Sequence, residues 1–236
     1  MNILLFEIIF KKWQLIRNFA LSFLVSAFLY YRYLPYENLA YDYLMIFGYL
    51  LFSYSLFQAS KKLLEVFTGP VRFFYLGAVQ KRIHAFTMTL LFSWIEFLLM
   101  YIPLLVFQCL AFSFLIQQNL LQIPISSVYS FGLLSLLQTS VLFITLVSFL
   151  FFVTIHSRFY SFMEASIWSG FVQYCSVALL LILVHFFLVD RFPIADIYSP
   201  VSLFNFSVID GFLMVLFNIF LFYWLSVLFN RKMDFY

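Results

Sequence analysis

The sequence SKKLLEVFTGPVRFFYLGAVQKRIH (residues 60–84) separates two long apolar segments and decides how the rest of the chain is arranged. The apolar segments on either side are long enough to cross a bilayer, so the side on which this basic segment lies sets the direction of every other segment. It holds five of the thirteen basic residues: Lys61, Lys62, Arg72, Lys81 and Arg82.

The composition indicates an integral membrane protein. Of the 236 residues, 65% are hydrophobic and 10% are charged, against about 45–50% and about 25% in soluble domains. A soluble domain of this size has too little interior to bury so many apolar side chains. The net charge of +3 comes with no nucleic-acid-binding motif, so no nucleic-acid partner is expected. Cys109 and Cys175 lie in apolar runs, without the spacing of a disulfide framework or a metal site.

Six apolar segments are candidates for membrane-spanning helices, which need about 20 residues each. The predicted fold class is therefore an all-α integral membrane protein with six transmembrane helices. In the third segment Pro103 is expected to bend the helix and to leave the residues beyond 108 as an interfacial tail. The first segment has the shortest apolar core, because Arg32 follows it at once. The segments are approximately 18–34, 41–59, 85–108, 128–153, 167–189 and 208–229.

The connecting segments differ strongly in charge. Six spans place eleven of the thirteen basic residues on one side of the membrane, and only Arg32 and Arg191 on the other. The positive-inside rule then puts both termini in the cytoplasm, an N-in/C-in topology. We expect a multi-pass protein of the cell membrane, of the kind found in the bacterial cytoplasmic membrane.

Residues 1–17 predict an amphipathic helix that lies in the cytoplasmic interface of the bilayer. Polar residues recur at positions 7, 11 and 14, and apolar residues at 5, 9, 13 and 16 line another face. Basic residues follow near its end, as in interfacial helices. This helix could act mechanically or could simply anchor the chain.

Residues 60–84 form the longest predicted cytoplasmic connection, although a turn between antiparallel helices needs far fewer residues. Thr68-Gly69-Pro70 is typical of a helix start, so a second short helix is expected within the connection. Phe73 and Phe74 would be costly to expose to water unless they contact lipid or a partner protein. The alternative is a basic stop signal whose lysines extend to the membrane surface.

Polar residues within the apolar segments are the second group of candidate functional residues. An ionisable side chain in a membrane span usually faces the bundle, where it is neutral or paired. We hypothesise that four such residues line a translocation path or a subunit seam, with the carboxylate recognising a cation. The alternative is that they make hydrogen bonds that hold the helices together. The four are Glu96, Gln138, Gln173 and Asn218.

The sequence contains no P-loop and no HExxH or GxSxG motif. Its acidic residues are scattered singly instead of forming a catalytic cluster. The chain is therefore not expected to be an enzyme or to bind a cofactor, and any ATP and Mg²⁺ would be bound by a separate partner chain.

This pattern resembles the membrane subunits of ABC type-2 permeases. The resemblance covers the whole chain, 1–236, as one transmembrane domain, and rests on an interfacial N-terminal helix, six spans, a long basic loop after the second span and both termini inside. In that family the loop carries an acidic residue, Gly-Thr and a coupling helix that contacts the ATPase. In this chain the order is Thr-Gly instead of Gly-Thr. The residues at the corresponding positions are Glu65, Thr68, Gly69, Pro70, Val71, Arg72, Phe73 and Phe74.

The resemblance implies an ATP-driven exporter in which this chain pairs with a second permease subunit, identical or related, and with two ATPase subunits. Small permeases of this kind resemble those that export amphipathic or antimicrobial peptides. Residues 190–207 would form an external loop, with or without short re-entrant helices. The alternative function is a membrane-embedded immunity or sensor protein that binds a peptide and has no ATPase.

Overall fold

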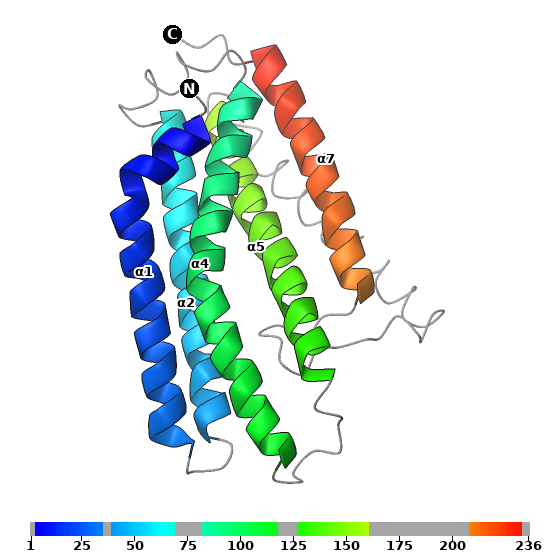
Figure 1. Cartoon of the computed structure of the whole chain (residues 1–236). Helices are drawn as coiled ribbons and strands as arrows, with labels where there is room; N and C mark the ends of the chain where they lie inside the picture. The colour runs from blue at the N-terminus through cyan, green and yellow to red at the C-terminus, as the bar shows by residue number, and fades with distance from the viewer. Residues whose placement is uncertain (1–2, 35–38, 69–81, 118–126, 161–207, 233–236) are drawn as a thin grey trace.

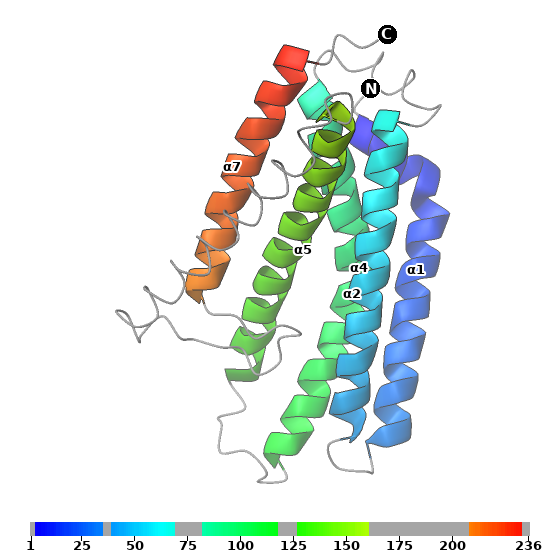
Figure 2. The same ribbon diagram turned by 180° about the vertical axis from the view of Figure 1, so that it is seen from behind.

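A computed structural model describes residues 3–34, 39–68, 82–117, 127–160 and 208–232 of the chain. These residues form helices, and no strand occurs among them. Figure 1 and Figure 2 show the helices packed lengthwise into an elongated bundle. The helices are α1 (Ile3–Tyr33), α2 (Leu39–Thr68), α4 (Arg82–Gln117), α5 (Ser127–Tyr160) and α7 (Val208–Lys232).

Helix α4 is the centre of the bundle, since it contacts each of the other four described helices. The helices α1, α2, α4 and α5 alternate in direction, whereas α7 runs in the same direction as its neighbour α5 (Figure 1). Two membrane-spanning helices that run in the same direction need an odd number of further spans between them in the sequence. The predicted span at 167–189 would be that further span. That span lies outside the described residues.

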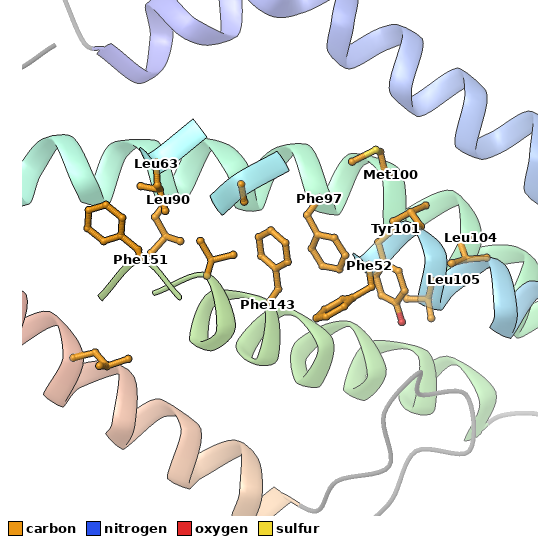
Figure 3. Close-up of a cluster of buried hydrophobic side chains, with 14 of the residues drawn as sticks. Phe52, Leu63, Leu90, Phe97, Met100, Tyr101, Leu104, Leu105, Phe143 and Phe151 are labelled. Carbon is orange, nitrogen blue, oxygen red and sulfur yellow. The ribbon is translucent and has the colours of Figure 1, made fainter. Parts of the chain in front are cut away.

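The core between α2, α4 and α5 is built from aromatic rings (Figure 3). Phe97 of α4 stacks on Phe143 of α5, with ring centroids 4.5 Å apart, and on Tyr101 one turn further along α4. Phe52 of α2 meets the Phe97 ring edge to face. All four rings are buried. Aromatic pairs contribute stability beyond the area they bury, so these contacts fix the relative positions of the three helices.

Four of the described helices are long and apolar enough to cross a membrane. They cover Leu39–Phe67, Ile83–Gln117, Ser127–Val153 and Asp210–Val227, which match the predicted spans at 41–59, 85–108, 128–153 and 208–229. Helix α1, which contains the predicted span 18–34, is not among them. Its apolar run is short, since only thirteen residues separate Arg17 and Asn18 from Arg32.

Several expected helix boundaries differ from the structure. Helix α2 continues through the first part of the expected connection at 60–84, so Thr68, expected near the start of a short helix, is instead its last residue. Helix α5 likewise continues to Tyr160, past the expected end at 153. Residues 3–33 form one continuous helix, so the expected separation of an interfacial helix at 1–17 from the next segment is not a break in helical structure. Its first turns nevertheless lean toward the ends of α2 and α4 (Figures 1 and 2). Helix α4 changes direction near its middle, as expected for a helix that contains Pro103. It then continues to Gln117, past the expected end at 108.

The basic residues of the described helices gather toward one end of the bundle. The start of α1, the end of α2 and the start of α4 lie at this end, together with the ends of α5 and α7 (Figure 1). At the opposite end, the last turn of α1 carries Arg32 and the first turn of α2 carries Asp42. We call the first of these ends the basic end of the bundle.

Helices α4 and α5 approach each other closely at Gly132, where a Cβ atom would lie 2.9 Å from Sγ of Cys109. We expect Gly132→Ala to lower the free energy of unfolding by about 1 kcal/mol, because the cost of overpacking exceeds the helix propensity gained. Chemical denaturation in detergent micelles would measure the loss.

Gly211→Ala is the matched control, since a Cβ there would meet nothing within 4 Å. Adding Cys109→Ala to Gly132→Ala should restore stability by removing the sulfur. Equal stability of Gly132→Ala and Gly211→Ala would contradict the close approach.

Candidate functional site

A polar cleft of about 150 Å³ lies between α1, α2 and α4, in the half of the bundle nearer the basic end. Polar and charged side chains predominate in its lining, although the helices around it are mainly apolar. Helix α2 contributes seven of its fourteen lining residues and α4 contributes four. The lining consists of Lys11, Gln14, Asn18, Tyr54, Ser55, Gln58, Ala59, Lys61, Lys62, Glu65, Ser93, Glu96, Phe97 and Met100.

An ion pair joins the two main walls of the cleft. Nζ of Lys62 in α2 lies 3.5 Å from Oε2 of Glu96 in α4, and the two side chains are only 13% and 16% exposed. The same ammonium group lies 3.4 Å from the ring centroid of the buried Phe92. A charge with so little access to water is stable only beside a partner, so the lysine, the carboxylate and the ring form one interdependent group.

The inward direction of Lys62 was not predicted, because the basic residues of 60–84 were all assigned to a cytoplasmic connection. The burial of its neighbours in α2 shows this direction. Three residues near Lys62 in α2 are buried. They are Ala59, three positions before it, Leu63, one position after it, and Val66, four positions after it. These positions share one helix face, so the lysine continues the inner stripe of α2.

Lys61 and Glu65 of α2, which also line the cleft, form a second and more exposed ion pair. Their charged atoms lie 3.8 Å apart, and both side chains are 59% exposed. Such a pair contributes little to stability because water screens it. Of the residues predicted to contact an ATPase, Glu65 and Thr68 lie in the last turns of α2. Residues 69–74 fall outside the described part of the chain.

Asn218, predicted to share a path or seam with Glu96, has different neighbours. Its Nδ2 donates hydrogen bonds to Oγ1 of Thr145 in α5, at 2.7 Å, and to the carbonyl oxygen of Met214, at 2.9 Å. It therefore links α7 to α5, whereas Glu96 links α4 to α2. The structure gives no contact between the two residues.

Gln138 also lies apart from the cleft, since it is buried within α5 and is not part of the lining. Gln173 lies outside the described residues. Near the other end of α4, the buried Gln108 donates a hydrogen bond of 3.4 Å to the carbonyl oxygen of Leu44 in α2. Of the three predicted path residues that the structure describes, Glu96 lines the cleft, whereas Gln138 and Asn218 do not.

Within the described ranges, no group of three or more His, Cys, Asp or Glu side chains could hold a metal ion. The cleft contains amine, amide, hydroxyl and carboxylate groups. These groups can bind a polar or charged partner by hydrogen bonds and ion pairs.

Comparison with protein-family models, with curated proteins and with solved structures finds no match to this chain.

Removing one member of the buried ion pair should be much more harmful than removing both. We expect Lys62→Met to lower the free energy of unfolding by about 3 kcal/mol, because Glu96 loses its cation within the bundle. The double variant Lys62→Met with Glu96→Leu should recover most of that loss. Chemical denaturation of the single and double variants forms a double-mutant cycle.

The exposed pair supplies the control for this cycle. Lys61→Met and Glu65→Gln should each change stability by no more than about 0.5 kcal/mol. Purely additive effects of Lys62→Met and Glu96→Leu would contradict the interaction between these side chains.

The hydrogen bond between α5 and α7 gives a further prediction. Thr145→Val and Asn218→Leu should each lower stability by about 1 kcal/mol, the usual size of such a bond between membrane helices. The double variant should cost little more than either single change, because both remove the same bond. Ser130→Ala on the exposed start of α5 is a control, and full additivity would show that the bond contributes nothing.

Proposed function

We propose that this protein is the permease subunit of an ATP-driven ABC exporter, with ATP and Mg²⁺ bound by two separate ATPase subunits. Four apolar helices of membrane-spanning length support the membrane location. The more specific proposal rests on the relation between the polar cleft and the connection between α2 and α4.

One observation carries the proposal: α2 and α4, which flank residues 69–81, are also the two main walls of the cleft. A force applied to that connection would act directly on both walls. An exporter whose energy comes from another chain needs such a mechanical link between the partner's contact surface and a polar site among the helices.

The Lys62–Glu96 ion pair is suited to this task. It joins α2 to α4 within the lining of the cleft. The aromatic contacts of Phe52 and Phe97 join the same helices beyond it. With both connections in place, α2 and α4 would respond to the partner as one unit.

The proposed assembly contains two permease subunits, identical or related, and its proposed cargo is an amphipathic or antimicrobial peptide. The cleft is consistent with such a cargo, because it offers charged and amide groups beside an apolar surface. Glu96 is the proposed contact for a cationic group, in competition with Lys62.

Contact with the ATPase should depend on the apolar residues of the 69–81 connection. We expect Phe73→Asp with Phe74→Asp, or Arg72→Glu, to reduce co-purification of an ATPase subunit from the native host by about tenfold or more. The altered protein should stay in the membrane fraction, since these residues lie between the predicted spans. Phe73→Leu with Phe74→Leu is the matched control, because it keeps the apolar character.

Purification of the tagged chain from its native host, under gentle conditions and without any nucleotide-binding protein, would overturn the proposal. If the isolated chain then bound a peptide directly, the result would favour the immunity or sensor function.

A further inference from the structure

The charges around the cleft do not cancel. Lys61 pairs with Glu65 and Lys62 pairs with Glu96, which leaves Lys11 of α1. Among the side chains that the structure describes, which begin at Lys11, no carboxylate lies within ion-pair distance of the Lys11 ammonium group. This ammonium group lies 5.5 Å from the centroid of the Phe92 ring. The cleft therefore has one positive charge in excess.

A buried hydrogen-bonding group lies in the part of the cleft lining that α4 provides. Ser93 of α4 is 3% exposed and lines the cleft. Its Oγ has no hydrogen-bond partner within the described part of the chain. A buried hydroxyl without a partner is costly, and a ligand in the cleft would supply one. The exposed amides of Gln14 and Gln58 provide further donors at its rim.

The position of the cleft relative to a bilayer indicates which ligand can reach it. Helix α2 has 30 residues and is about 45 Å long, so its ends extend beyond a hydrocarbon core of about 30 Å. Lys61 lies seven residues before the end of α2, about 10 Å along the helix. This places the lysines of the cleft near the boundary between acyl chains and headgroups.

We propose that the cleft binds a phosphate group at Lys11 and Ser93, and that this phosphate belongs to an anionic phospholipid headgroup. Basic pockets between membrane helices hold such headgroups by combining charge attraction with hydrogen bonds. The inference does not depend on the transport function, because it uses only the charges, the burial and the depth of the cleft.

The test measures lipid binding to the full chain in uncharged detergent micelles, where no extended anionic surface exists. Phosphatidylglycerol is titrated in, and bound lipid is counted by native mass spectrometry. We expect Lys11→Gln to weaken binding about fivefold. Lys12→Gln removes the same charge from the neighbouring residue, which is outside the cleft, and should change binding less than about twofold. Phosphatidylcholine, whose headgroup carries its own cation, should bind more weakly.

A second pair of variants tests the other wall with smaller changes. Ser93→Ala should weaken phosphatidylglycerol binding about threefold or more by removing a hydrogen bond to a charged group. Ser148→Ala is its control. Ser148 is likewise buried, its Oγ has no hydrogen-bond partner among the described residues, and it is not part of the cleft. This pair decides the question even if Lys11→Gln proves unstable.

Inorganic phosphate at matched ionic strength distinguishes the two sources of the ligand. A lipid site should show no competition between millimolar phosphate and phosphatidylglycerol. Full competition that depends on Lys11 would overturn the assignment to lipid. Equal losses in the cleft variants and their controls, or no loss in any of them, would overturn the phosphate site itself.

Discussion

A charged side chain among membrane helices needs an opposite charge inside the bundle, and the interaction of Lys62 with Glu96 satisfies this requirement between α2 and α4. The rest of the arrangement depends on it. Loss of either residue would leave the other buried without its ion-pair partner, and their contact fixes the rotation of both helices. The ring of Phe92 stabilises the ammonium group from a second direction.

Elsewhere in the bundle, hydroxyl and amide groups connect the helices. The buried Tyr101 hydroxyl lies 3.0 Å from Oγ of Ser135, which links α4 to α5. Ser22 of α1 donates a hydrogen bond to the carbonyl oxygen of Met100 in α4. Each such bond is weak alone, but each is specific in direction, whereas apolar packing between lipid-like surfaces is not. Polar contacts therefore define which helix faces meet.

The helical segments could be predicted from sequence because their cause is local. An apolar run of about 20 residues is helical in a membrane whatever its neighbours are, and four predicted spans match described helices. The expected bend at Pro103 follows from the missing backbone donor. The continuity of α1 could not be predicted in this way, because a polar stretch at 11–18 is compatible with an interfacial helix and with the start of a longer one.

The cleft could be predicted only in part. Glu96 was recognised as a buried carboxylate from its position in an apolar segment. Its partner Lys62 is 34 positions earlier in the sequence and was assigned to the cytoplasmic connection. The burial of Ala59, Leu63 and Val66 shows that this part of α2 faces the bundle. Without that burial, the charge of the neighbouring Lys62 indicates a position in water. Lys11 and Ser93 became candidates through packing alone, since α1 contributes the first and α4 the second to the lining of the same cleft.

The uneven burial of the helices has a consequence for how related sequences would diverge. In the apolar, membrane-spanning part of α4, 61% of the residues are buried within the bundle, whereas in that of α7 only 11% are buried. Positions on the outer face of α7, such as Phe212 and Ile219, can exchange among apolar residues with little effect on packing. Substitutions in α4 affect the contacts with all four neighbouring helices. Recognisable similarity in distant relatives should therefore persist longest in α4 and in the α2 positions that face it, while α7 loses it first.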